Sequence, residues 1–143
     1  MPRWRGFDNP FGDTWTNLDG VVIQRTAANE ISSVYTTTNK EEFTDVIGGK
    51  TIAGYEVAQD GYIKEFDLGE TAEIIPSSCA EASPTTYICD YHWCNLSYTE
   101  LRTLRVGGGA NNSGSEGLGS FHSGYGVGYA DSAVGFRTLN RVS

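Results

Sequence analysis

The densest group of potentially reactive side chains lies in a single six-residue stretch, Cys89–Cys94. It combines two thiols with the imidazole of His92 and the carboxylate of Asp90, and all of these groups can bind metal ions. Common structural zinc sites pair C-x2-4-C with a second pair of ligands elsewhere, and only Cys79 and His122 remain to complete such a shell. We therefore predict no metal site and no cofactor.

The same stretch has the composition of a strand, in which alternate side chains point to opposite faces. Cys89 and Trp93 would then share one face, and His92 and Cys94 the other. Because free cysteine usually behaves as a small buried hydrophobe, we expect a core strand with Cys89 and Trp93 buried and His92 partly exposed. A disulfide between Cys79 and either of the other thiols stays open as an alternative.

Two further kinds of chemistry lack the residues that they need. The glycine runs at Gly107–Gly109 and Gly124–Gly128 could suit a phosphate loop, but neither is followed by Lys-Ser/Thr or by a helix start. A nucleophilic cysteine needs a neighbouring histidine and an orienting group, and the chain has two histidines, His92 and His122. We expect that the protein is not an enzyme.

The last third of the chain has instead the composition of a recognition surface. Ten of the eighteen glycines lie between Gly107 and Gly135, among Asn, Ser, Tyr, Phe and His, and no Lys or Arg lies between Arg105 and Arg137. Binding surfaces favour rigid amphipathic aromatic residues beside small, adaptable polar ones. This segment is therefore expected to be a displayed, ligand-contacting surface.

Short strands must position that surface. Runs rich in β-branched and aromatic residues predict strands at 21–24, 34–37, 62–66, 85–89 and 101–106. One helix start stands out at Asn39–Glu42, where Asn39 can cap the helix and Glu42 can return the hydrogen bond, before Gly48–Gly49 ends it. The predicted class is α+β, strand- and loop-rich, with short strands and one or two short helices.

Four large rings near the N-terminus are spaced too irregularly for one face of a strand or helix. They are Trp4, Phe7, Phe11 and Trp15. We expect a looped segment that plugs these rings into the core, since each ring buries a large apolar area.

Composition and charge exclude several classes of protein. A chain of 143 residues with 38% hydrophobic and 12% aromatic residues is expected to fold as one domain, 1–143. The net charge of −8 opposes binding to nucleic acid or to anionic lipid. No window approaches the roughly 20 apolar residues of a membrane span, so no membrane insertion is expected.

The two ends of the chain resemble a known family. The segment Arg5–Trp15 is similar to the G-N-x-W-E-W segment of formylglycine-generating, sulfatase-modifying-factor-like domains, and Leu104–Gly108 and Gly135–Arg137 are similar to their R-V-x-R-G-G-S-W and closing G-F-R. More narrowly, Asn9 to Arg137, about nine tenths of the chain, resembles lectin-like domains of phages of gut bacteria, among them variable proteins of diversity-generating retroelements. The resemblance implies a C-type lectin-like fold, either alone or as the C-terminal domain of a longer fibre protein.

The tail keeps the register of those variable proteins, with Gly107-Gly108, Asn111-Asn112 and Val134–Arg137 in the matching places. Ala110 stands where the family usually has Trp, and the cysteines do not match the catalytic pair of the formylglycine enzymes, so the resemblance does not extend to oxidase activity. The positions that it implies for ligand contact are Ala110, Asn111, Asn112, Ser115, Ser120, His122, Tyr125, Tyr129 and Asp131.

The resemblance implies a phage structural protein at the virion surface, made in the host cytoplasm. It would be a head fibre or tail fibre tip that binds a bacterial surface receptor, glycan or protein, for host adsorption, as a homotrimer beside other virion proteins. Between anchors at Leu104–Gly108 and Val134–Arg137, side chains are expected to vary without touching the core. Two alternatives stay open: a purely structural virion decoration or fibre protein whose tail packs in a subunit interface, and a formylglycine-type enzyme, which copper binding and thiol oxidation would reveal.

Overall fold

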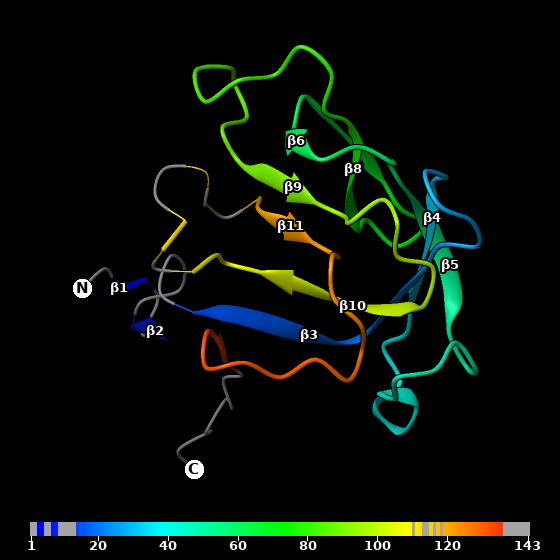
Figure 1. Cartoon of the computed structure of the whole chain (residues 1–143). Coiled ribbons are helices and arrows are strands. Elements are labelled where there is room, and N and C mark those ends of the chain that lie inside the picture. The colour runs from blue at the N-terminus through cyan, green and yellow to red at the C-terminus, as the bar shows by residue number, and fades with distance from the viewer. Residues whose placement is uncertain are drawn as a thin grey trace.

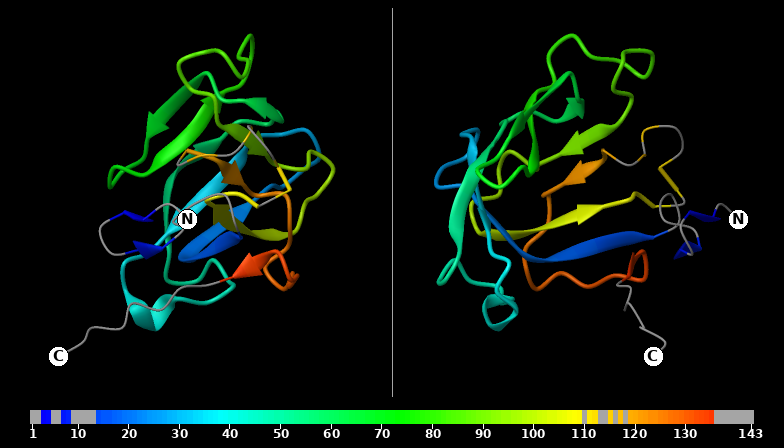
Figure 2. Two further views of the ribbon diagram at one scale, coloured as in Figure 1. Left: turned by 90° about the vertical axis from the view of Figure 1, so that its left-hand side faces the viewer. Right: turned by 180° about the vertical axis from the view of Figure 1, so that it is seen from behind.

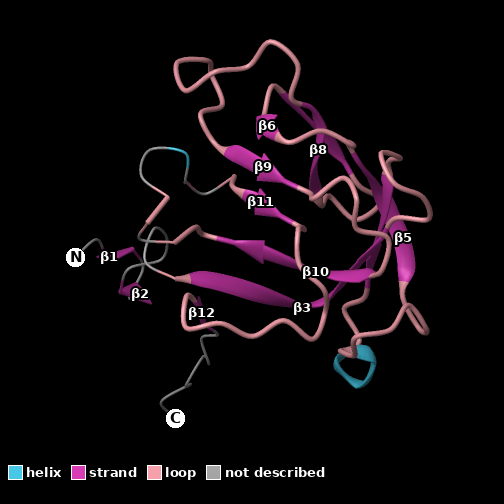
Figure 3. Cartoon of the chain, in the orientation of Figure 1, coloured by secondary structure: helices cyan, strands magenta, loops and turns pink. Residues whose placement is uncertain are grey.

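The computed structural model describes residues 14–109, 111, 112, 115, 117 and 119–135, together with the backbone of residues 3–4 and 7–8. This part of the chain is a curled mixed sheet, and its helical content is limited to short 3-10 turns such as η1 (Lys40–Glu42) (Figure 3). The predicted α+β, C-type lectin-like class with one or two short helices is therefore wrong. Within the same residues, no helix is long and apolar enough to cross a membrane.

Eight strands form the main sheet (Figure 1). Their order is β5 (Thr51–Glu56), β4 (Ser32–Thr36), β3 (Trp15–Gln24), β10 (Leu101–Val106), β11 (Phe121–His122), β9 (Tyr91–Trp93) and β6 (Gly61–Tyr62), with β12 (Val134–Gly135) also paired to β3. The β11–β9 and β12–β3 pairs are parallel and the others are antiparallel. Two separate hairpins are β7 (Glu65–Leu68) with β8 (Ile74–Ser78), and β1 (Arg3–Trp4) with β2 (Phe7–Asp8).

The hydrophobic core lies where the main sheet curls toward the β7–β8 hairpin. Figure 2 shows the curl, because β4 and β5 run at a steep angle to β3 and β10. The cluster of buried side chains comprises Ile23, Val34, Ala53, Ile63, Ile75, Cys79, Leu104 and Phe121. It draws on both the main sheet and β8, so its burial holds the two sheets together.

Three of the predicted strands are confirmed: 21–24 lies within β3, 34–37 overlaps β4, and 101–106 coincides with β10. The run at 62–66 is divided between β6 and β7. The strand predicted at 85–89 is wrong, because this stretch forms turns and irregular structure. There the Thr86 hydroxyl donates to the Ser83 carbonyl at 2.7 Å, and such local side-chain bonds compete with strand pairing.

The predicted helix is reduced to a single turn. Asn39 caps it as expected, since its side chain accepts from the Glu41 N–H at 3.2 Å. Glu42 does not return the bond, and its carboxylate accepts instead from the Thr37 hydroxyl at 2.7 Å. The Lys50 ammonium donates to the Glu42 carbonyl at 2.7 Å, taking the acceptor that the next helical turn would need.

Both anchors of the tail lie in the sheet. Thr16 of β3 pairs with Val106 of β10 and with Gly135 of β12, so the chain enters and leaves the tail beside the same residue. Gly107 and Gly108, at φ +89° and +77°, make the turn after β10, a conformation that favours glycine. Phe136 and Arg137 lie outside the described residues.

Between these anchors, the tail contributes a central strand. β11 lies between β10 and β9, with Phe121 in the core and Ser120 and Ser123 buried beside it. The expectation that side chains between the anchors vary without touching the core is therefore wrong for 120–124.

Of the N-terminal rings, Trp15 is buried and opens β3. Trp4 and Phe7 belong to the paired strands β1 and β2, and their side chains, like Phe11, lie outside the described residues.

Candidate functional site

Cross-strand register places several rings and one guanidinium on one face of the main sheet. Tyr62 pairs with Tyr91, Trp93 with His122, and His122 with Arg105. Directly paired residues project from the same face of a sheet, as do residues two apart in one strand, such as Tyr91 and Trp93. The sheet therefore carries a continuous line of aromatic side chains across β6, β9 and β11, ending at Arg105 of β10.

These rings are in contact. The Tyr62 and Tyr91 centroids lie 5.1 Å apart, those of Tyr91 and Trp93 4.5 Å, and those of Trp93 and His122 5.4 Å. The imidazole of His122 stacks on the Trp93 indole with an interplanar angle of 23°. Trp15 of β3 packs edge-on against the His122 ring, with centroids 4.9 Å apart, and so supports this line of rings from that strand.

The chain after β11 extends this line. Segment 123–133 runs along β10, where Thr103 N donates to the Tyr125 carbonyl at 3.3 Å, and then passes in front of β10 and β3 to reach β12 (Figure 1). The Tyr125 ring stacks on His122, with centroids 5.1 Å apart, and on Tyr129 at 4.2 Å. We call the six rings the aromatic row: Tyr62, Tyr91, Trp93, His122, Tyr125 and Tyr129.

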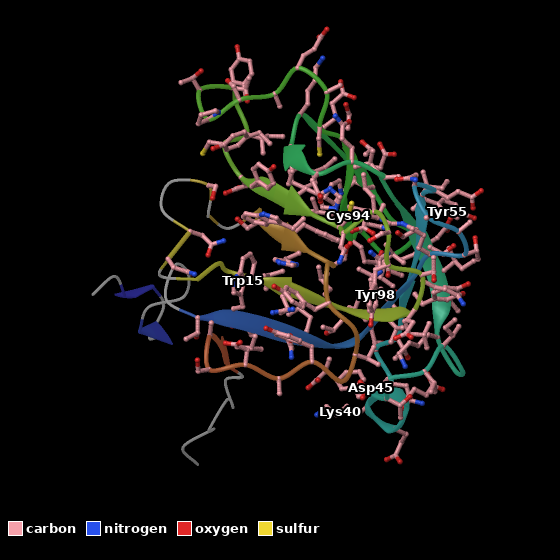
Figure 4. The ribbon with its side chains drawn as sticks, in the orientation of Figure 1. Trp15, Lys40, Asp45, Tyr55, Cys94 and Tyr98 are labelled. Atoms are coloured by element: carbon pink, nitrogen blue, oxygen red, sulfur yellow. The ribbon has the colours of Figure 1, made fainter. Side chains whose placement is uncertain are left out.

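Two cavities share the outer part of the aromatic row. The larger cavity has a volume of about 1020 Å³ and the smaller one about 340 Å³, and Trp93, His122, Tyr125 and Tyr129 line both. Figure 4 labels a residue of each: Tyr98, in the larger cavity, and Trp15, in the smaller cavity, lie toward opposite ends of β10. The row is thus bordered on two sides by space for a ligand.

Polar groups surround the rings in both cavities. The larger cavity is lined by Asn29, Asp60, Asn95 and Glu100 among others. The smaller cavity is lined by Arg105, Asn111, Asn112 and Asp131. Aromatic faces that supply apolar contact, with a few placed hydrogen-bonding groups, are the usual composition of a small-molecule or oligomer site.

Arg105 is the most unusual of these groups, because it is only 3% exposed and yet has two donors without a partner in the part of the chain that the structure describes. Its guanidinium carbon lies 4.0 Å from the Tyr125 ring centroid and 4.9 Å from that of Tyr129. Nε and Nη2 have no hydrogen-bond partner among the described residues. An unpaired buried donor costs about 1 to 3 kcal/mol, so this arrangement needs an explanation.

His122 is a neutral member of the aromatic row. Burial, with a smaller contribution from the positive charge of Arg105, lowers the pKa of His122 to about 4. The Gly124 N–H donates to His122 Nδ1 at 3.1 Å, which makes Nδ1 an acceptor and places the proton on Nε2. At neutral pH the ring therefore stacks between Trp93 and Tyr125 without adding a charge.

Beneath the aromatic row lies a buried polar network centred on Glu56, at the end of β5. His92 Nε2 donates to the Glu56 carboxylate at 2.8 Å, and the Ser123 hydroxyl donates to the same oxygen, Oε1. Arg102 Nη2 lies 3.6 Å from Glu56 Oε2. The side chains of Glu56, His92 and Arg102 are fully buried, so this network links β5, β9, β10 and the chain after β11.

The charges of this network stabilise one another. Burial alone would lower the pKa of His92, but the contacts with Cys79 and Glu56 outweigh burial and raise the pKa to about 9. Burial would likewise raise the pKa of Glu56, but the hydrogen bond and charge of His92, together with Arg102 and Ser123, outweigh burial and lower that pKa. With both nitrogens protonated, His92 also donates from Nδ1 to the Gln59 carbonyl at 2.8 Å. Glu56 and His92 thus form a charged pair at neutral pH.

These shifts predict that the free energy of unfolding is highest near pH 6.5. The contribution of His92 is complete below pH 6.5 and is lost as pH rises through about 9, because the pKa is raised in the folded state. The contribution of His122 is lost as pH falls from 6.5 toward about 4, because its pKa is lowered on folding. At 1.36 kcal/mol per pH unit, either shift amounts to at most about 3 kcal/mol. Urea unfolding at pH 4.5, 6.5 and 9 checks this, and equal stability at all three values would contradict it.

The structure brings together most of the residues that the sequence assigned to ligand contact. The members that line the smaller cavity are Asn111, Asn112, His122, Tyr125, Tyr129 and Asp131. Ser115 is half-buried and its hydroxyl donates to the Asn112 carbonyl at 2.8 Å. Ser120 is buried away from this cavity, and its hydroxyl accepts from the Gly117 N–H at 2.9 Å. Ala110 lies outside the described residues.

Sequence reasoning missed the residues that the sheet adds to the site. Tyr91 and Trp93 come from β9, which precedes the tail by more than ten residues, and Arg105 comes from β10, which leads directly into the tail. Trp15 was expected only as a core anchor, yet it also lines the smaller cavity. A signal was available in Tyr91-His92-Trp93, because aromatic rings two apart in a strand share a face. Whether these two rings point to the core or to the opposite face depends on the pairing of β9 with β11. That pairing cannot be read from the local sequence.

The faces expected for Cys89–Cys94 are reversed. His92 and Cys94 are buried, whereas Trp93 is half-buried in the aromatic row and Cys89 is exposed. The expectation of buried Cys89 and Trp93 with a partly exposed His92 is therefore wrong. Cys79, Cys89 and Cys94 are all free thiols, and no cluster of three His, Cys, Asp or Glu side chains that could hold a metal ion occurs in the described part of the chain.

Comparison with known proteins finds no family model, no curated protein and no solved structure that matches this chain.

Proposed function

We propose that this domain binds a glycan on a bacterial cell surface, and that it does so as the receptor-binding part of a phage head fibre or tail fibre. The single observation that carries the binding role is the aromatic row with a cavity on each side of it. The row would stack on the apolar faces of sugar rings, and the polar groups around it would bind hydroxyl groups.

The chemistry of the row favours a sugar over other flat ligands. A net charge of −8 opposes nucleic acid, whose bases could also stack on aromatic rings. Asp60 and Glu100 in the larger cavity are acceptors for hydroxyl donors, and Asn29 and Asn95 can both donate and accept. Sugars present both kinds of group along one edge of each ring.

The phage setting rests on the resemblance of the tail to variable proteins of diversity-generating retroelements. In this proposal the segment 125–131 is the part that changes between variants, because it lies over the sheet and is largely exposed. A single site of this kind would be weak, so we propose display as a homotrimer, in which several sites engage one cell together.

The test uses the labelled, purified domain and a panel of gut bacterial isolates. The domain is expected to bind a subset of strains. Periodate treatment of the cells, which cleaves the vicinal diols of sugars, should abolish that binding, and protease treatment should leave it intact. Binding that survives periodate and disappears after protease treatment would refute a glycan receptor and favour a protein one.

The architectural alternative has its own signature. If the tail packs in a subunit interface, the domain should bind none of the strains, and analytical ultracentrifugation should show an oligomer that Tyr125→Ala dissociates. A glycan-binding domain should keep its oligomeric state in that variant, because Tyr125 then faces ligand and not a neighbouring subunit.

A further inference from the structure

We infer that Arg105 is an anion-recognition residue, and that the smaller cavity binds the carboxylate of an acidic sugar such as a hexuronic or sialic acid. This inference rests on the proposed glycan-binding function and names the class of glycan. It starts from the Arg105 guanidinium, which is buried, lines the cavity, and has two nitrogens without a partner among the described residues.

The two unpaired nitrogens form a specific recognition edge. Nε and Nη2 project their N–H bonds side by side along one edge of the planar guanidinium, which matches the two oxygens of a carboxylate. Other buried arginines use this edge in part: Arg102 Nη2 donates to the Ser32 hydroxyl at 2.6 Å, and Arg25 Nε donates to the Glu30 carbonyl at 2.8 Å. Within the described residues, the complete two-donor edge is left unused at Arg105 alone.

No acidic side chain of the described region forms an ion pair with Arg105. The ion pairs in this region are those of Lys64 with Glu81 and of His92 and Arg102 with Glu56. Asp131 also lines the cavity, and its charge favours the charged form of Arg105. Its carboxylate, however, accepts hydrogen bonds from the Tyr129 hydroxyl at 3.0 Å and the Ala133 N–H at 2.9 Å, not from the guanidinium. Burial lowers the pKa of Arg105, yet an arginine stays protonated in proteins, so a positive charge remains in the cavity.

The rest of the cavity fits one sugar residue around that charge. Its volume of about 340 Å³ is at the lower end of the range for small-molecule sites, about 300 to 1000 Å³. Asn111 and Asn112 supply amide groups for hydroxyls, and Trp15 and Trp93 supply apolar wall. A sugar whose carboxylate reaches Arg105 would thus meet hydroxyl partners and a ring face in the same cavity.

The covering of Arg105 sets a condition on binding. Tyr125 and Tyr129 lie over the guanidinium, and Nε and Nη2 are closed to solvent. Both tyrosines belong to the exposed segment 125–131, and binding of a carboxylate to the buried edge requires a local shift that exposes these two nitrogens. We expect the signals of Tyr129 and of the Trp15 indole N–H to move in NMR spectra when an acidic sugar binds.

The experiment compares matched acidic and neutral sugars on the intact chain. NMR titration and calorimetry measure the affinities for the methyl glycosides of glucuronic, galacturonic and N-acetylneuraminic acid, for methyl glucoside and galactoside, and for glucose 6-phosphate. At least one carboxylate sugar should bind tenfold or more tightly than the neutral sugars and than the phosphate. In Arg105→Gln the ratio of acidic to neutral affinity should fall to near one, whereas Arg105→Lys, which keeps the charge but not the fork, should fall between the two.

Each outcome decides the inference separately from the proposed function. Neutral sugars that bind as tightly as acidic ones, a preference for phosphate, or no binding of any acidic sugar would each overturn it, while the periodate experiment on cells still decides whether the domain binds glycans. If Arg105→Gln does not fold, the comparison within the unaltered chain and the Arg105→Lys ratio carry the decision.

Discussion

Replacing Glu56 with alanine is expected to lower the free energy of unfolding by about 3 to 5 kcal/mol, the usual cost of removing one partner from a buried ion pair. The loss arises because the His92 imidazolium and the Arg102 guanidinium, both fully buried, would face each other without a negative charge between them. The Ser123 hydroxyl would also lose its acceptor on Glu56. Urea unfolding at pH 6.5 measures the change.

A matched substitution isolates the effect of burial and pairing. Glu65 lies on β7 and is exposed, so Glu65→Ala should change the free energy of unfolding by less than about 0.5 kcal/mol. NMR titration gives a second readout, because Glu56→Gln should bring the pKa of His92 down from about 9. A loss below 1 kcal/mol in Glu56→Ala, with the His92 titration unchanged, would show that the network does not hold the sheet together.

Removing both outer rings of the aromatic row, Tyr125→Ala with Tyr129→Ala, is expected to abolish adsorption to cells, with a loss of affinity of a hundredfold or more. A few aromatic residues usually carry most of the binding energy of a site, and these two line both cavities. Both rings lie outside the hydrophobic core, so the variant loses their contacts with each other, His122 and Arg105 but none within the core. The Tm should fall by less than about 5 °C.

The control for this variant removes two tyrosines outside the site. Tyr55 on β5 and Tyr87 in the 85–89 turn region are 54% and 109% exposed, and neither lines a cavity of the site. Tyr55→Ala with Tyr87→Ala should leave cell binding unchanged. If both double variants bind cells as the original domain does, the aromatic row is not the receptor site.

Much of the strand content is readable from the sequence, whereas the class is not. Leu101–Val106 and 21–24 are rich in β-branched and aliphatic residues, and both form strands as predicted. The helix at Asn39–Glu42 has a correct cap, but its continuation depends on Lys50, whose side chain takes up the loop carbonyls. A capping pattern is a local signal, and a lysine eight residues away is not part of it.

The candidate site shows the same division between local and distant information. Composition alone predicts a binding segment in the tail, because Tyr125, Tyr129 and the two asparagines are typical of recognition surfaces. The partners of these residues, Trp93 and Arg105, come from strands whose neighbours are set by long-range pairing with β11. The reversal of His92 and Trp93 has the same cause, since a strand of alternating large residues can present either set to the core.

The position of β11 also determines when this chain can fold. β9 and β6 join β10 and β3 through this two-residue strand from the last third of the sequence, and β12 pairs with the start of β3. Contacts between distant parts of a sequence slow folding, because loop entropy must be lost before they form. A chain still emerging from the ribosome would therefore hold two unjoined sheet fragments with open edges until β11 has been synthesised.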